Sequence, residues 1–181
     1  VTLSGLTEVL FDRYAGDNTT QLPPEQKLYL LPDNIVALPA LNILSFLSAV
    51  NTESAPKLLF PSKDYKKIAA AMLASTIISP SAIPFLRDDK PIVFGGFDAD
   101  GLDALSGIRV VRHVARLAGG IPNPKIRPML GLPWTLKFDM TLLAHPGLSL
   151  EIVEKLFVEG GMRLGIGTFR KAFGKFEFAW S

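Results

Sequence analysis

Residues 132–142 constrain the fold most, because apolar and polar side chains alternate along this segment. The apolar positions are Leu132, Trp134, Leu136, Phe138, Met140 and Leu142. The positions between them include Thr135, Lys137, Asp139 and Thr141. A period of two residues is that of a β-strand with one buried face and one face in water. The segment therefore predicts a strand in an antiparallel sheet that is covered on one side.

Other segments carry shorter signals. Apolar residues at helical spacing predict helices over residues 39–50 and 63–77, the second capped by Ser62. Ser149 is the expected cap of a further helix, which we expect Gly160 and Gly161 to end. Strands are expected at 1–6, 26–31, 92–97, 108–117, 125–130 and 175–180, with turns at 79–84 and 119–124. A helix is the alternative at 108–117.

The order of these elements predicts the fold class. A strand, helices, a long hairpin, a helix and a strand follow the β-α-β-β-α-β plan of ferredoxin-like α+β domains. We therefore expect a single domain over residues 1–181, with an antiparallel sheet, helices on one of its faces and a long basic β-hairpin. The remaining segment, at about 52–105, is expected to be a helical or loop insertion.

Composition excludes several classes of site. The 181 residues contain no cysteine, which excludes disulfides, thiol catalysis and cysteine-bound metals. The mean hydropathy of +0.29 is high, yet the apolar runs at 35–50 and 68–78 are shorter than the roughly 20 residues that span a membrane. The sequence begins with no basic segment and apolar core of the signal-peptide type. We expect a cytoplasmic protein without membrane contact, whose surplus apolar surface forms a homo-oligomer interface.

The basic residues are segregated along the chain, although the net charge is only +2. Residues 104–138 and 160–176 contain no acidic residue and hold ten of the nineteen lysines and arginines. These ten are Arg109, Arg112, Arg116, Lys125, Arg127, Lys137, Arg163, Arg170, Lys171 and Lys175. Two basic segments that converge would attract a phosphate backbone. The alternative is a solvated or interface-pairing basic face, or protection of a strand edge.

A glycine-rich segment between the last predicted helix and strand adds to this pattern. Gly165 and Gly167 allow positive φ angles, which would let backbone amides approach an anion. Phe169 and Phe173 are expected to stack on bases, and the neighbouring Arg170 and Lys171 to contact phosphates. No phosphate-binding loop of the Walker type is present. The alternative is an ordinary helix-to-strand connection.

This glycine-rich segment resembles that of the RAMP superfamily, the RNA-recognition-like proteins that build CRISPR effector backbones and process guide RNA. The matching positions are Gly165, Gly167, Arg170, Lys171, Gly174, Lys175 and Phe176. The resemblance, shared with uncharacterised phage-encoded proteins, implies binding of RNA or single-stranded DNA along sheet, hairpin and loop. It also implies self-assembly, other effector-complex subunits as partners, and the cytoplasm of a prokaryotic or virus-infected cell. The chain is shorter than the usual backbone subunit.

The sequence offers little for catalysis. His113 lies within a predicted strand and is interpreted as a nucleic-acid contact, and His145 lies in a turn. Asp98, Asp100 and Asp103 are typical of a surface turn rather than a calcium loop. We therefore expect no catalytic residue, metal or cofactor, and a nuclease that uses His113 is a minor alternative. The main alternative is a structural or inhibitory phage protein, such as a mimic of a CRISPR backbone subunit, that acts through protein contacts.

Overall fold

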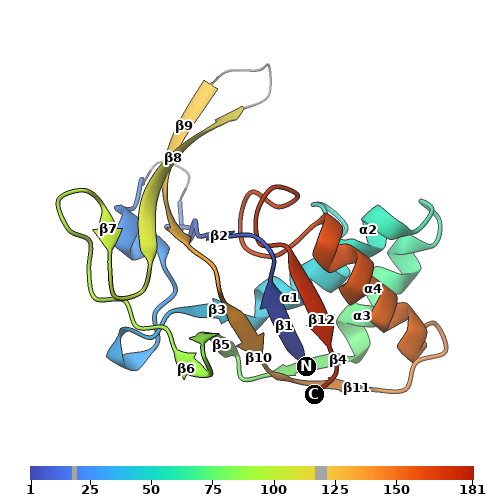
Figure 1. The fold of residues 1–181 in the computed structure, drawn as a ribbon. Coiled ribbons are helices and arrows are strands. Elements are labelled where there is room, and N and C mark those ends of the chain that lie inside the picture. Colours follow the sequence, from blue (N-terminus) through green and yellow to red (C-terminus); the bar gives the residue numbers. More distant parts are fainter. Residues whose placement is uncertain (18–19, 117–121) are drawn as a thin grey trace.

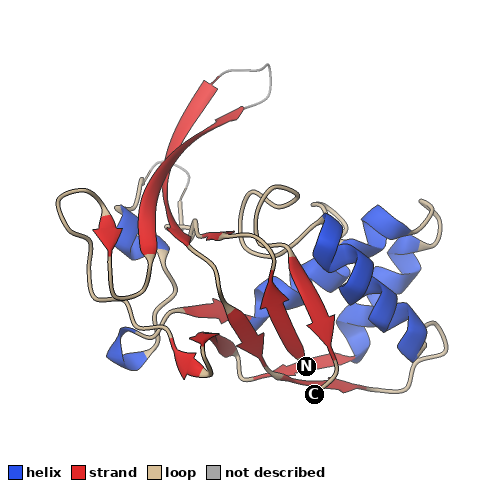
Figure 2. Ribbon diagram, in the orientation of Figure 1, coloured by secondary structure: helices blue, strands red, loops and turns tan. Residues whose placement is uncertain are grey.

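The computed structural model describes residues 1–17, 20–116 and 122–181, and its strands pair antiparallel in three sheets (Figures 1 and 2). The central sheet contains β1 (Thr2–Gly5), β3 (Ala37–Pro39), β5 (Ala82–Arg87), β6 (Lys90–Pro91), β10 (Thr135–Lys137) and β12 (Phe176–Ala179). Its order is β12-β1-β10-β5-β3, and β6 pairs with β5. The fold is therefore mixed α+β with antiparallel sheets, as predicted.

The central sheet has one apolar and one polar face. In the register, Leu3 lies opposite Leu136 and Phe178, and Leu136 lies opposite Phe85. Leu3, Leu136 and Phe85 are fully buried. The opposite face carries Thr2, Ser4, Thr135, Lys137 and Glu177. Burial of the apolar face against the helices supplies the main force that holds the sheet in place.

The predicted strand at 132–142 divides into two strands that belong to different sheets. After β10, the chain continues as β11 (Asp139–Leu142), which pairs with β4 (Thr76–Ser79). Phe138 lies at the division, and its side chain stays buried while its N–H donates to the carbonyl of Val1. The alternation of burial thus continues across the division. Leu132 is 46% exposed and lies outside both strands, contrary to the prediction.

Helices α1 (Ala40–Ser48) and α4 (Leu150–Arg163) cover the apolar face (Figure 1). Helices α2 (Ala55–Leu59) and α3 (Tyr65–Ser75) pack on these two. The ring centre of Phe46 in α1 lies 6.0 Å from that of Phe157 in α4 and 5.5 Å from that of Phe176 in β12. Phe157 stacks on Phe178 with 4.8 Å between ring centres. Aromatic packing therefore ties α1 and α4 to β12.

Helix α4 begins where predicted but ends later. The Ser149 hydroxyl accepts a hydrogen bond from the N–H of Ile152 at 3.3 Å, which pairs one of the free amides at the helix start. The expectation that Gly160 and Gly161 end the helix is wrong, because α4 continues through both. A β-carbon at Gly161 would lie 2.6 Å from the ring of Phe176. These glycines therefore permit close helix packing.

Three other segments differ from the prediction. Helix α3 begins after Asp64 rather than with a cap from Ser62, and Ile77 lies in β4 with 56% of its surface exposed. Residues 26–31 form no strand: the 3₁₀ turn η1 (Pro24–Lys27) ends among them, Leu30 forms an isolated bridge with Val36, and a second 3₁₀ turn, η2 (Pro32–Asn34), follows. Residues 92–97 contain an isolated bridge at Val93 in place of a strand.

The segment 52–105, expected to be an insertion, supplies β5 to the central sheet. Strand β5 begins at Ala82, inside the proline-containing segment 79–84 that predicts a turn. Pro84 lies within the strand, opposite Ala37 of β3. None of the helices in the described part of the chain has both the length and the apolar character that crossing a membrane requires.

A second sheet carries the long hairpin, which projects from the rest of the molecule (Figure 1). Its order is β2-β9-β8-β7, from β2 (Val9–Leu10), β7 (Leu102–Asp103), β8 (Ile108–Arg116) and β9 (Pro122–Leu130). Strands β8 and β9 pair along their whole length, so the strand rather than the helix alternative at 108–117 is confirmed over residues 108–116. Of the turn predicted at 119–124, residues 119–121 lie outside the described residues, and the prediction is wrong for residues 122–124, which belong to β9.

Arg87 links the central sheet to the base of this hairpin. Its guanidinium donates to three carbonyl oxygens, those of Ser106 (2.9 Å), Pro133 (3.1 Å) and Gly131 (3.2 Å). Ser106 precedes β8, whereas the other two carbonyls lie between β9 and β10. The side chain of Arg87, at the end of β5, therefore fixes the position of the hairpin base relative to the central sheet.

Replacing Arg87 by Gln is expected to lower the free energy of unfolding by about 2 kcal/mol, because hydrogen bonds from a charged donor to carbonyls are lost. Urea denaturation measures this change. The exposed Lys90→Gln in β6 removes the same charge and is expected to change stability by less than about 0.5 kcal/mol. Equal stability of the two variants would contradict the role assigned to Arg87.

Candidate nucleic-acid interface

The register of the hairpin sorts its basic residues onto two faces. Residues directly opposite each other in antiparallel strands share a face. One face, here called the inner face, carries Arg109, Val111 and His113 of β8 and Lys125, Arg127 and Met129 of β9. Arg112 lies on the other face with Val114 and Ile126, and all three are exposed. Arg116 ends β8, and its side chain is outside the described part of the structure.

The Gly-rich loop, residues 164–175, lies against the inner face. The ring of His113 is 5.2 Å from that of Phe173 and 6.0 Å from that of Phe169, measured between ring centres. The Cζ atom of Arg127 lies 5.9 Å from the centre of the Phe169 ring. The structure therefore brings the predicted aromatic residues of the loop onto the predicted basic residues of the hairpin.

The backbone of the loop is fixed by hydrogen bonds to the segment that contains β2. The N–H of Gly174 donates to the carbonyl of Glu8 at 2.7 Å, and the N–H of Thr168 donates to that of Leu10 at 3.1 Å. The N–H of Gly167 donates to the side-chain oxygen of Asn42 at 3.0 Å. The N–H of Gly165 donates to the carbonyl of Gly160 at 3.3 Å. The prediction that the amides of Gly165 and Gly167 approach an anion is thus wrong, because protein oxygens already accept from them.

Asp12 is the acidic residue that pairs with the buried cations of this site, and no sequence pattern predicted it. Its carboxylate pairs with Arg127 at 2.8 Å and with Lys27 at 3.5 Å. Lys27 also donates to the carbonyl of Ile126 at 2.5 Å. Asp12 lies outside both acid-free segments, and its partner Arg127 is 115 residues away. No local pattern in the sequence identifies a pair of this kind.

Two cations, Arg127 of the inner face and Lys27, therefore share one carboxylate. Arg127 is 6% and Lys27 is 7% exposed, so both charges are largely removed from water. Next to them lies a hollow of about 400 Å³, whose lining includes Asp12, Arg13, Lys27 and Lys125. Arg109, a further cation of the inner face, is 57% exposed and pairs with Glu8 at 3.4 Å. The site keeps a surplus of positive charge that attracts anions.

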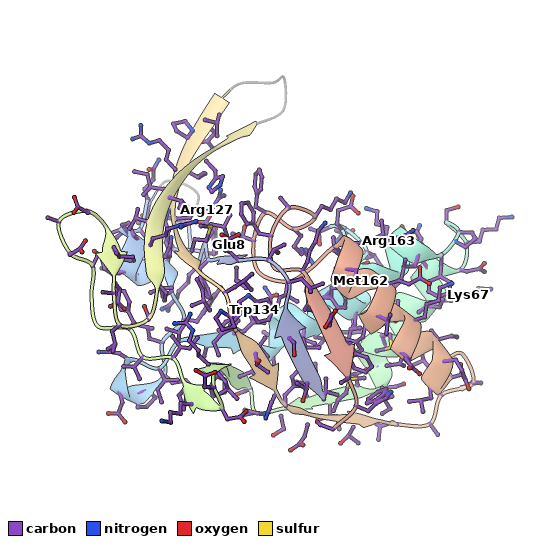
Figure 3. The ribbon with its side chains drawn as sticks, in the orientation of Figure 1. Glu8, Lys67, Arg127, Trp134, Met162 and Arg163 are labelled. Atoms are coloured by element: carbon purple, nitrogen blue, oxygen red, sulfur yellow. The ribbon has the colours of Figure 1, made fainter. Side chains whose placement is uncertain are left out.

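The remaining predicted residues lie apart from the inner face or are paired elsewhere. Lys137 pairs with Asp89 on the polar face of the central sheet. Arg163, labelled in Figure 3, lies on α4 and pairs with Glu159 of the same helix. Lys171 pairs with Glu53 at 3.4 Å. Burial lowers the pKa of Arg170, and the nearby carboxylate of Glu53 opposes this shift. Lys175 joins the loop to β12, and its N–H donates to the hydroxyl of Thr7.

The side chains of Asp98, Asp103 and His145 hold turns. The Asp98 carboxylate accepts from the N–H groups of Asp100 (3.0 Å) and Leu102 (2.9 Å). Asp103 is buried and accepts from the N–H of Gly95 at 2.9 Å. His145 accepts from the N–H of Gly147 within its own turn. Across residues 1–17, 20–116 and 122–181, no three His, Asp or Glu side chains are grouped as metal ligands would be.

Comparisons of the chain with protein-family models, with curated proteins and with solved structures find no match. Function must therefore be inferred from the side chains that the hairpin and the Gly-rich loop bring together. These side chains provide cations from β8 and β9 and two aromatic rings from the loop.

Replacing Gly174 by Ala is expected to lower the free energy of unfolding by at least about 3 kcal/mol. The φ angle of Gly174 is +70°, and a β-carbon there would collide with the carbonyl oxygen of Ile166. Chemical denaturation of the variant measures the loss.

The control is Gly96→Ala, because Gly96 has a φ of +108° and no described atom within 4 Å of the added carbon. It should show the backbone cost alone, about 1–2 kcal/mol. Equal losses at the two positions would mean that the loop does not pack as described.

Proposed function

We propose that the chain binds single-stranded nucleic acid, RNA or DNA, between the inner face of the hairpin and the Gly-rich loop, without catalysing a reaction on it. The observation that carries this proposal is the contact of Phe169 and Phe173 with His113 and Arg127. It places stacking surfaces beside cations, which is the combination that single-strand binders use.

Charge supports an extended phosphate backbone as the ligand. Arg109, Lys125 and Arg127 lie on the inner face, and Arg127 shares the single carboxylate of Asp12 with Lys27. A surplus of positive charge along a strand pair attracts a polyanion and makes its affinity depend on salt. The basic residues on the inner face are therefore the phosphate contacts of the proposal.

The aromatic residues supply the contact with bases. Phe169 is 41% exposed, and Phe173 is half-buried beside it at 6.2 Å between ring centres. Stacking of a base on an aromatic side chain contributes roughly 1–3 kcal/mol and is tolerant of sequence. We therefore expect affinity for single strands of any sequence and weaker binding of duplexes, whose bases are already stacked.

The strand order supports a ferredoxin-like sheet of the RAMP type as the scaffold. One β-α-β unit runs from β1 to β5 and the other from β10 to β12. In the sheet, β10 lies between β1 and β5, and β1 lies between β10 and β12, which is the split arrangement of ferredoxin-like sheets. Helices α1 and α4 lie within these two units. In this proposal the hairpin is an addition between β5 and β10, and the chain works in the cytoplasm of a prokaryotic or virus-infected cell, with copies of itself and other effector subunits.

Fluorescence anisotropy with labelled single strands across salt concentrations tests the function. The logarithm of the association constant should fall linearly with the logarithm of salt. Each phosphate contact contributes roughly 0.7 to this slope for single strands, so Arg109→Gln with Lys125→Gln should reduce it by about 1.4.

The matched control is Lys66→Gln with Lys67→Gln, two exposed lysines on α3 that lie away from the hairpin (Figure 3). It removes the same charge and should leave the slope within about 0.3 of the parent value. Affinity that is indifferent to salt, or an equal effect of both double variants, would contradict the proposal.

Exposed apolar side chains favour the alternative of a structural or inhibitory protein that binds a protein partner. Leu41, Leu73 and Ile77 are 73%, 58% and 56% exposed. Light scattering after size exclusion, together with the ratio of absorbance at 260 and 280 nm, separates the two functions. A discrete complex free of nucleic acid, which also fails to bind added strands, would support the alternative.

A further inference from the structure

Two buried nitrogen atoms between the inner face and the Gly-rich loop have no hydrogen-bond partner among the described residues. They are Nη1 of Arg127 and Nδ1 of His113. Arg127 lies opposite Val111, and His113 is the next inner-face residue along β8. Buried polar atoms of native proteins are paired in the large majority, so each such atom needs an explanation. These two lie on one face and contact one ring, that of Phe169.

Asp12 contacts one edge of the Arg127 guanidinium and leaves Nη1 without a partner among the described residues. The Oδ2 atom of Asp12 accepts a hydrogen bond from Nε at 2.8 Å and forms an ion pair with Nη2, also at 2.8 Å, and Nη1 is not part of this pair. Lys27 lies 3.5 Å from the other oxygen of the same carboxylate. One negative charge therefore serves two buried positive charges. A buried cation is stabilised by a further anion with good hydrogen-bond geometry.

We propose that a phosphate oxygen of the bound strand fits between Arg127 Nη1 and His113 Nδ1, and this rests on the proposed function. Arg127 donates from Nη1, and His113 donates from Nδ1 when that atom carries the proton. The phosphate balances the positive charge of Arg127 and Lys27 that the single carboxylate of Asp12 does not neutralise. The base of the same nucleotide stacks on Phe169 or Phe173. The pair thus forms the fixed anchor for one phosphate, and Arg109 and Lys125 are more exposed contacts for its neighbours.

Phe169 controls access to this anchor. Its ring contacts both unpartnered groups, and its φ angle of 55° lies in the left-handed region that a bulky side chain seldom adopts. Lys171, two residues later, has a φ of 75°. Strained residues of this kind concentrate at ligand sites and switch regions. A rotation of the Phe169 side chain would open the two nitrogen atoms to the ligand and present the ring to a base.

NMR of the full chain, with ¹⁵N in the side chains of histidine and arginine, tests the anchor directly. One titration uses inorganic phosphate and the other a single-stranded ten-nucleotide DNA without a terminal phosphate. We expect the His113 imidazole and the Arg127 guanidinium signals to shift together in both titrations. The Arg87 guanidinium, which is bound to three carbonyls at the hairpin base, serves as the internal reference and should not move.

Each other outcome separates the anchor from the proposed function. If the strand binds and the Arg109 signal shifts while those of Arg127 and His113 stay, the anchor is wrong and the function stands. If the strand does not bind but inorganic phosphate shifts both signals, the site takes a free phosphate and the strand proposal is overturned. If neither ligand shifts them, water alone pairs these nitrogen atoms, and the anchor is overturned.

Two variants give the size of the effect. Arg127→Gln should weaken binding of the strand roughly 10- to 100-fold, because a charged hydrogen-bond donor is lost. His113→Phe should weaken it about fivefold, because one hydrogen bond is lost while the ring contacts with Phe169 and Phe173 remain. The second variant keeps the packing, so it tests the anchor even if the first fails to fold.

Lys67→Gln on α3 is the control and should bind as the parent does. Binding by His113→Phe that equals that of this control, in a variant of unchanged thermal stability, would overturn the role of Nδ1.

Discussion

The short strand β2 determines how the proposed site is assembled, because it bonds to the hairpin and to the Gly-rich loop at once. Val9 and Leu10 pair with Leu130 and Met129 of β9. The carbonyl of Leu10 also accepts from the N–H of Thr168, and the carbonyl of Glu8, just before β2, accepts from the N–H of Gly174. Backbone hydrogen bonds of β2 therefore hold the loop beside the inner face. The contacts between aromatic rings and cations follow from this placement.

The residues around β2 also supply the charges that balance the hairpin. Glu8 pairs with the exposed Arg109, and Asp12 pairs with the buried Arg127 and Lys27. These two acids anchor the hairpin base without neutralising it, since they face at least three cations, with Lys125 in addition. One short segment thus fixes both the position of the hairpin and the residual positive charge. The loop adds the rings on which bases can stack.

The sequence predicts the elements better than it predicts their contacts. The hairpin at 108–130, the cap Ser149 and the last strand follow from local patterns, and the structure confirms them. Strand β5 is missed because Pro80 before it and Pro84 within it are typical of a turn, and Gly160 is misread because its role is close packing with other helices. Local charge identifies basic segments, but the hairpin register decides which cations share a face. The pairing of Asp12 depends on a contact across the chain, which one sequence does not reveal.

Crosslinking with ultraviolet light, followed by mass spectrometry of the peptides, tests the central claim that hairpin and loop form one binding surface for a single strand. A uniformly labelled thiouridine strand reports every side chain that its bases touch. We expect crosslinks at Phe169 or Phe173 in the loop and on the inner face around His113, all lost in high salt. Crosslinks confined to the polar face of the central sheet, around Lys137, would contradict it.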